Sequence, residues 1–89
     1  MNNQVVLESL ASDLRRVALG LQRGSTTMAN RFAQEALRRR NEVEISSVDE
    51  YIKKLLRQLD KAMEDPEDAL MYSTILQNYA LHRYQSASS

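Results

Sequence analysis

The chain contains 89 residues, with twelve basic and twelve acidic side chains and a formal net charge of zero. It has no cysteine, which excludes disulfides, thiolate zinc sites and thiol catalysis. Its apolar runs are far shorter than the roughly 20 residues that cross a bilayer, and its first residues lack the features of a secretory signal. We therefore expect one small cytoplasmic domain over residues 1–89, with no membrane contact.

The first predicted helix covers residues 4–23. Leucine and valine recur there at alternating spacings of three and four residues, which gives the helix one apolar stripe. The stripe consists of Leu7, Leu10, Leu14, Val17 and Leu21. Gly20 and Gly24 weaken the end of this helix, because glycine is a poor helix former.

The second predicted helix covers residues 27–42, with Thr27 as its N-cap. Its apolar face is dominated by alanine, at Ala29, Ala33 and Ala36. Such small side chains permit close approach of a neighbouring helix.

The third predicted helix covers residues 47–64. Ser47 and Glu50 have the spacing of a capping box, in which each side chain accepts a hydrogen bond from the other residue's backbone amide. The apolar residues that follow form one face, with lysine, arginine and acidic residues opposite.

The fourth predicted helix covers residues 66–84. Asp65 suits its N-cap, and Pro66 suits the first helical position, where a missing N–H has no cost. Glu67 and Asp68 place negative charge at the positive end of the helix dipole.

This fourth helix carries thirteen consecutive uncharged residues, 69–81, in a chain that is 27% charged. Ordinary surface helices have a charged outer side, so a helix that is neutral all round is covered by its own protein or by another. We expect Tyr72 and Tyr79 to lie in the core or at its boundary. The other side, where we expect a protein interface, consists of Leu70, Thr74, Gln77 and Leu81.

Four amphipathic segments with short connections predict an all-α fold, a small antiparallel four-helix bundle made of two helical hairpins. Only two glycines and one proline are present, and runs of β-branched residues are absent, which disfavours a sheet. The two hairpins either fold back on each other or open and exchange with a second chain.

No enzyme is predicted. His82 is the one histidine, and neither an activated nucleophile nor a glycine-rich phosphate loop accompanies it. The carboxylates within residues 64–68 lack the spacing and turn glycine of a calcium loop, and helix capping around Pro66 accounts for them. We therefore expect no metal, no cofactor and no small-molecule substrate.

Charge is divided unequally along the chain. Residues 1–41 hold seven arginines and three acids, whereas residues 42–89 hold five cations and nine acids. Two complementary helical halves that pack on each other or on a second copy explain this division, and a nucleic-acid surface is the alternative. The residues proposed for phosphate binding under that alternative are Arg31, Arg38 and Arg39.

The sequence contains the segments ALRRRNEV, at 36–43, and EDALMYSTILQNYALH, at 67–82. In these segments it resembles short all-helical proteins of the kind found in cyanobacteria, a group without an assigned activity. The resemblance implies a helical fold and no particular chemistry.

A second pattern covers residues 48–83: a helix with a Leu-Asp-Lys run, a turn with proline, and a helix with spaced tyrosines. Its positions are Val48, Asp49, Leu59, Asp60, Lys61, Asp65, Pro66, Tyr72, Leu76, Tyr79, Leu81 and Arg83. This pattern resembles the helical hairpin of type III secretion needle subunits and implies a subunit that polymerises. Needle subunits continue past the hairpin in a segment needed for polymerisation, and the present chain has a further hairpin before it.

The sequence thus predicts a non-catalytic helical interaction module. It either self-associates as a homo-oligomer or docks to a protein partner through the helix at 66–84. Nucleic-acid binding through the arginine-rich first half and a needle-like subunit are the alternatives. The partner, the pathway and the oligomeric state stay open.

Overall fold

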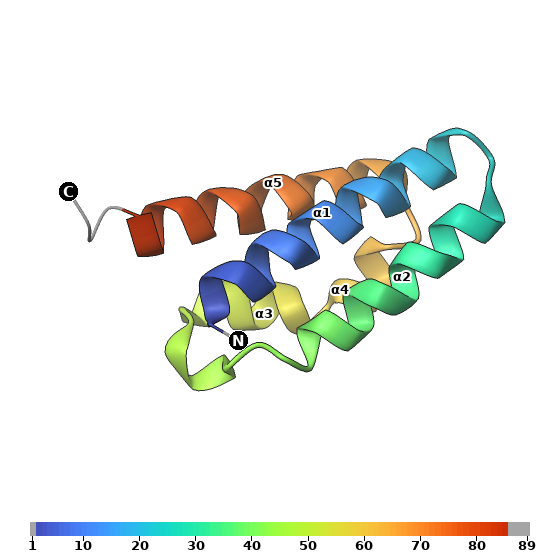
Figure 1. Ribbon diagram of the computed structural model, residues 1–89. Coiled ribbons are helices and arrows are strands. Elements are labelled where there is room, and N and C mark those ends of the chain that lie inside the picture. The colour runs from blue at the N-terminus through green and yellow to red at the C-terminus, as the bar shows by residue number, and fades with distance from the viewer. Residues whose placement is uncertain (1, 86–89) are drawn as a thin grey trace.

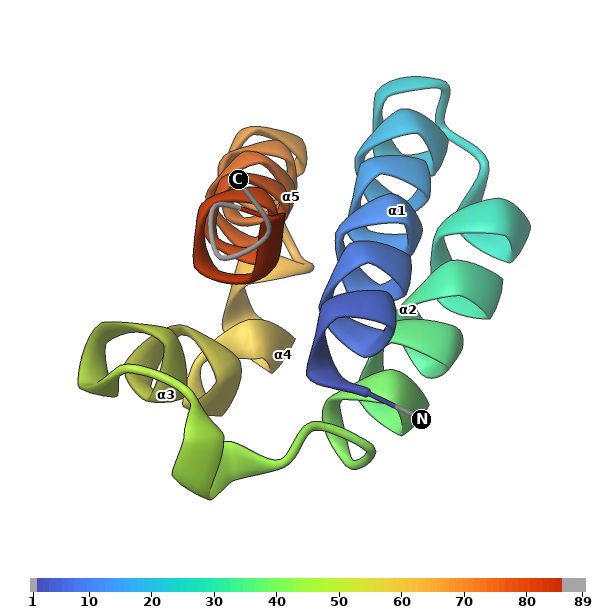
Figure 2. The same ribbon diagram turned by 60° about the vertical axis from the view of Figure 1, so that its left-hand side comes forward.

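Helix α1 (Asn3–Gln22) lies between α2 (Thr26–Arg40) on one side and α5 (Pro66–Ala80) on the other (Figures 1 and 2). The computed structural model describes residues 2–85, which are helical with short connections and contain no strand. The all-α prediction is confirmed. Among these described residues, no helix has both the length and the apolar character needed to cross a membrane.

Helices α1 and α2 form a tight antiparallel hairpin. Gly24 has a φ of +72°, and this left-handed turn is followed by Ser25 in extended conformation. The Ser25 hydroxyl accepts a hydrogen bond from the Met28 amide at 3.2 Å. Ser25 is therefore the N-cap, and the prediction of Thr27 was wrong by two residues because the glycine turn brings the earlier hydroxyl to the helix end.

Gly20 marks the closest approach in this hairpin. A Cβ placed on Gly20 would lie 2.8 Å from the backbone nitrogen of Ala29, closer than side-chain carbons approach backbone atoms. The small residues predicted to permit close packing do so here, with Ala29 and Ala36 buried. The missing side chain of Gly20 thus allows α1 and α2 to approach closely at Ala29.

The third predicted helix is not continuous. A 3₁₀ turn (Ile45–Ser47), helix α3 (Glu50–Arg57) and helix α4 (Leu59–Ala62) replace it. The chain bends at Gln58, whose amide is shared between the carbonyls of Lys54 and Leu55, at 3.2 and 3.1 Å. That bend tightens the end of α3 and redirects the chain toward the start of α5.

The predicted capping box is also wrong. Ser47 lies exposed in the 3₁₀ turn, and Val48 and Asp49 are extended, so α3 begins only at Glu50. Asp49 occupies the N-cap position and makes no side-chain capping bond. The physical reason is burial: the extended backbone at Val48 directs this 6%-exposed side chain into the core, which outweighs a single capping bond.

Helix α5 begins as predicted. The Asp65 carboxylate accepts a hydrogen bond from the Asp68 amide at 3.0 Å, and Pro66 occupies the first helical position. The helix ends at Ala80 and continues as a π-helical turn (Leu81–Gln85), close to the expected end at residue 84.

Helix α5 runs antiparallel to α1, and a buried hydrogen bond joins the two. The Ser73 hydroxyl donates to the carbonyl oxygen of Ala11 at 2.6 Å. The largest fully buried side chains come from α1, α3, α4 and α5: Val6, Leu7, Leu10, Leu14, Val17, Ile52, Leu56, Leu59 and Leu76.

Two tyrosines of α5 form hydrogen bonds to the part of the chain that contains α3. The Tyr72 hydroxyl donates to Gln58 Oε1 at 3.4 Å, and the Tyr79 hydroxyl accepts from the Asp49 amide at 3.3 Å. Tyr72 is buried and Tyr79 is half-buried against the core. Burial raises the pKa of the Tyr72 hydroxyl, with a smaller contribution from the Asp68 carboxylate.

Candidate interaction surface on α5

The side of α5 that faces away from the core carries no charge between its first and last turns. We call Leu70, Met71, Thr74, Gln77, Asn78 and Leu81 the outer face of α5. Leu70 is 43% exposed and Met71 is 50% exposed, which are large fractions for apolar side chains of this size. Thr74 and Asn78 are exposed, and Gln77 and Leu81 are half-buried.

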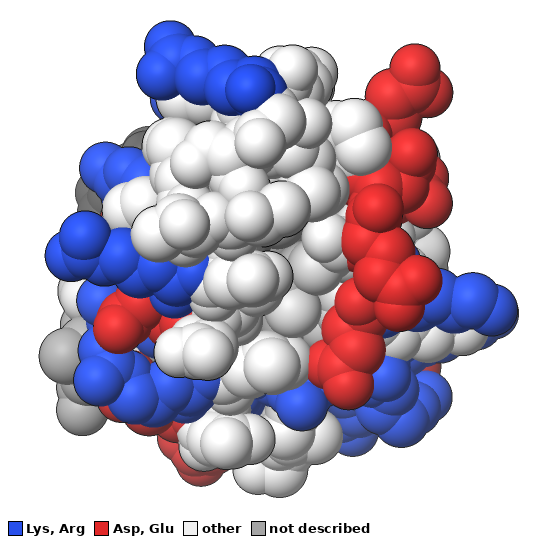
Figure 3. Space-filling model, turned by 90° about the vertical axis from the view of Figure 1, so that its right-hand side faces the viewer, with Lys and Arg blue, Asp and Glu red and all other residues white. Residues whose placement is uncertain are grey.

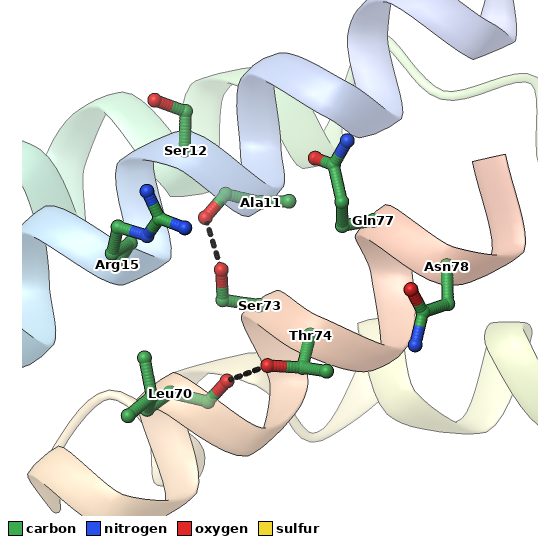
Figure 4. A pocket seen from close by; sticks show the side chains of 8 residues that line it. All are labelled: Ala11, Ser12, Arg15, Leu70, Ser73, Thr74, Gln77 and Asn78. Atoms are coloured by element: carbon green, nitrogen blue, oxygen red, sulfur yellow. Dashed lines mark hydrogen bonds between the residues drawn. The ribbon is translucent and has the colours of Figure 1, made fainter. Parts of the chain in front are cut away.

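A hollow of about 440 Å³ lies between α1 and α5 (Figure 4). Its lining residues are Ala11, Ser12, Arg15, Leu70, Ser73, Thr74, Gln77 and Asn78. Figure 4 shows the Gln77 side chain directed toward α1 across this hollow, and Ser73 bonded to the Ala11 carbonyl at its floor. The hollow is therefore a groove with neutral polar walls and a single cation.

A second hollow of about 400 Å³ follows the other side of the same helix. Its lining residues are Glu67, Leu70, Met71, Thr74 and Ile75. Leu70 and Thr74 line both hollows, so they form a ridge between two depressions. The Thr74 hydroxyl donates to the Leu70 carbonyl at 3.1 Å within the helix, so it is already satisfied and presents little unmet polarity to a partner.

The structure brings the predicted residues Leu70, Thr74 and Gln77 together along one groove, with Leu81 one turn further on. Sequence reasoning missed Met71, the more exposed neighbour of Leu70, and the α1 residues Ser12 and Arg15. The run of apolar residues from 69 to 72 was a signal for Met71. Ser12 and Arg15 gave none, since their place beside α5 depends on how two distant helices pack.

Charge is segregated around the end of the molecule where α1 turns into α2 (Figure 3). There an uncharged surface lies between a stripe of acidic side chains on one side and a group of mostly basic side chains on the other, and further basic side chains border the lower end of the acidic stripe. The segment joining α4 to α5 supplies the exposed acids Glu64 and Asp65, and the first turn of α5 supplies Glu67 and Asp68.

The arginines considered for phosphate binding are engaged within the chain. Arg39 donates from Nε to Asp13 at 3.0 Å, Arg38 pairs with Glu35, and the Arg31 guanidinium lies 5.7 Å from the centroid of the Phe32 ring. These contacts separate the three side chains among different partners. The three arginine side chains therefore do not form one anion-binding group.

A third hollow, of about 560 Å³ and lined by basic side chains, lies between the end of α2 and α3. Arg40, Lys53 and Arg57 surround it, with Ile45 and Leu56 as apolar lining. Arg40 and Lys53 each bond to an exposed carboxylate at 3.1 Å, which offsets much of its positive charge. In the described part of the chain, histidine and acidic side chains do not gather in groups of three that could hold a metal ion.

Comparison with family models, curated proteins and solved structures finds no match to this chain. Its own surface therefore provides the indications of its function. The most distinctive part of that surface is the outer face of α5, because it combines exposed apolar side chains, two hollows and a lack of charge.

Proposed function

We propose that the chain is a non-catalytic protein-interaction module that binds protein through the outer face of α5. We take its framework to be an antiparallel four-helix bundle in which α3 and α4 together supply the third helix. The observation that carries the proposal is the joint exposure of Leu70 and Met71 on a helix with thirteen consecutive uncharged residues. Interface centres are depleted of charge and enriched in methionine, which matches the lack of charge on this face and the exposure of Met71.

The chemistry of the groove favours binding over catalysis. Its polar side chains are hydroxyls and amides, together with the one guanidinium of Arg15. These groups form hydrogen bonds but do not transfer protons near neutral pH. The apolar ridge beside them provides contact area. A partner helix with small apolar and neutral polar residues suits such a surface.

Site-specific photocrosslinking tests the proposal. Benzoylphenylalanine is placed at position 71, in place of Met71, and in a second variant at position 51, in place of Tyr51. Tyr51 is 59% exposed on α3 and so offers a matched accessible control outside the surface. Each variant is irradiated in cells that express the chain, and the adducts are identified by mass spectrometry.

We expect protein adducts from position 71 and few from position 51. The adducts should disappear when Leu70→Glu and Leu81→Glu are added, since two carboxylates would have to be desolvated in the contact. Equal adducts at both positions, or none at position 71, would show that α5 is not a binding surface.

A further inference from the structure

We propose that the hollow between the end of α2 and α3 is a docking site for a peptide segment that presents an apolar side chain next to a carboxylate. The residues that line this hollow of about 560 Å³ are Arg40, Asn41, Ile45, Lys53, Leu56 and Arg57. None of them belongs to the outer face of α5, so the inference goes beyond the function proposed above and does not depend on it. Three observations support it: an exposed isoleucine, unused arginine donors and the local balance of charge.

The apolar part of the hollow is an isoleucine exposed on a turn that is held in place. Ile45 is 43% exposed, although Val43 and Val48, on either side of it in the chain, are buried. The backbone before it is bound by Asn3, whose side chain donates to the Glu44 carbonyl at 3.1 Å and accepts from the Glu44 amide at 2.8 Å. A turn fixed in this way loses little conformational entropy when its apolar side chain contacts a ligand.

Two arginines of the hollow have hydrogen-bond donors that the chain itself does not use. Arg40 donates from Nη1 to the Leu56 carbonyl at 3.3 Å and to the Asp60 carboxylate at 3.1 Å. Its Nη2 and Nε have no acceptor among the described residues, and the exposed Arg57 side chain forms no hydrogen bond or ion pair with any of them. Because a guanidinium matches the two oxygens of a carboxylate, these donors favour that group as a ligand.

The balance of charge at the hollow favours one carboxylate over a polyanion. Three cations line the hollow, and two of them pair with carboxylates that are not part of the lining. Those carboxylates, Asp60 and Glu50, are 70% and 83% exposed, so their ion pairs are weak. Three positive and two negative charges leave a net charge of +1. A single carboxylate matches this charge, whereas a nucleic-acid strand binds through many cations.

A peptide fits the hollow better than a small anion does. The hollow is open at the surface, whereas small-molecule sites bury most of their ligand. The half-buried aliphatic stems of Arg40 and Lys53 add apolar surface beside Ile45. An apolar side chain with an acidic neighbour along one peptide therefore meets both the apolar lining and the cations at its rim.

Peptide selection tests the site. Random peptides displayed on phage are first depleted on the Ile45→Ser variant, which lacks the apolar side chain but keeps every cation, and are then selected on the wild-type chain. Fluorescence anisotropy measures the dissociation constants of the selected peptides for Lys53→Glu and Arg57→Glu. The charge control is Lys54→Glu, because Lys54 is exposed on the same helix, lies outside the hollow and has no ion-pair partner among the described residues. The apolar control is Val5→Ser, because Val5 is also 43% exposed.

We expect the selected peptides to share an apolar residue with an aspartate or glutamate beside it. Lys53→Glu and Arg57→Glu should each raise the dissociation constant about tenfold or more, because an attraction becomes a repulsion. Lys54→Glu and Val5→Ser should leave it within about twofold. Added salt should weaken the binding, since it screens the charges at the rim. Circular dichroism verifies that every variant keeps its helical content.

Other results would overturn the inference. Selected peptides that lack acidic residues, or that bind Arg57→Glu as well as the wild-type chain, would show that the hollow does not bind a carboxylate. A selection that yields no peptide after depletion would contradict peptide docking. If octanoate or a random-sequence oligonucleotide binds instead and loses its affinity for Arg57→Glu, the hollow takes another class of ligand and the inference is wrong. The α5 surface is tested separately, by crosslinking from position 71.

Discussion

The guanidinium of Arg39 on α2 donates from Nε to the carboxylate of Asp13 on α1 at 3.0 Å, within a side-chain environment that leaves Asp13 only 7% exposed. Burial raises the pKa of the Asp13 carboxyl above its ordinary value of 3.8, and the Arg39 charge and hydrogen bond oppose that rise. This pair therefore couples the α1–α2 hairpin to pH.

Replacing Arg39→Gln should lower the free energy of unfolding at neutral pH by about 2 kcal/mol, because a buried carboxylate loses its charged partner. A carboxyl with a raised pKa binds its proton more tightly in the folded state, so its contribution to stability falls as pH rises from 3.8 through the folded pKa. In the Arg39→Gln variant, this loss of the Asp13 contribution to stability should extend to higher pH. Urea unfolding at a series of pH values checks it, and curves that stay parallel to wild type would contradict it.

Replacing Gly20→Ala should destabilise the protein by about 1–3 kcal/mol, since the added Cβ would meet the Ala29 backbone nitrogen at 2.8 Å and push α2 away. At an ordinary helix position the same change would be stabilising. Gly24→Ala is the comparison: its Cβ meets open space, so its cost of about 1–2 kcal/mol comes from the φ of +72° alone. Gly24→Asn should recover part of that cost, whereas Gly20→Asn should not.

Replacing Ser25→Ala should cost about 1 kcal/mol, because the Met28 amide loses its capping acceptor. Ser47→Ala should change the unfolding free energy by less than about 0.5 kcal/mol, because Ser47 is exposed and caps no helix. Chemical denaturation of the two variants side by side measures the difference. A larger effect at Ser47 than at Ser25 would restore the capping box as a structural element.

Replacing Ser73→Ala should cost about 1 kcal/mol, since it removes the buried hydrogen bond to Ala11 that joins α5 to α1. Thr74→Ala, one residue away, should be close to neutral, because its exposed hydroxyl bonds only within its own helix. Thermal unfolding distinguishes the two. Equal midpoints for the two variants would mean that the hydroxyl of Ser73 does not contribute to α5 docking.

The double variant Leu70→Glu with Leu81→Glu should keep its helical circular dichroism and have a smaller molar mass than the wild-type assembly. Residues 69–81 carry no charge of their own, so the introduced carboxylates would have to be desolvated in a contact on this face. Light scattering measures the mass, with Tyr51→Glu as the control on α3. If the double variant and the control behave alike, the outer face of α5 is not the contact.

Local patterns in the sequence were sufficient to predict the first, second and fourth of the four expected helices, and they failed for the third. Periodicity and end signals placed α1, α2 and α5 within one or two residues of their starts, and Asp65 was identified as an N-cap. The third helix failed because Ser47 and Glu50 carry a valid local signal that burial of Val48 overrides. The bend at Gln58 likewise reflects the path required toward α5.

Relationships between helices were the least predictable part. Gly20 was interpreted as a weak helix end, and its contact with Ala29 is invisible without the packing of α1 on α2. The partnership of Arg39 with Asp13 joins residues 26 positions apart, and no periodic pattern encodes it. At the candidate surface, the lack of charge was visible in the sequence, but the groove beside α1 was not.

The hydrogen bond between Ser73 and Ala11 has a consequence for the order of assembly, because it joins residues 62 positions apart. The α1–α2 hairpin closes over a short loop, whereas α5 reaches α1 only after the intervening segments are in place. Since α1 is synthesised before α5, its leucine-rich side lacks this covering helix until the end of the chain is made. The contact between α5 and α1 therefore forms late, after the local contacts of the α1–α2 hairpin.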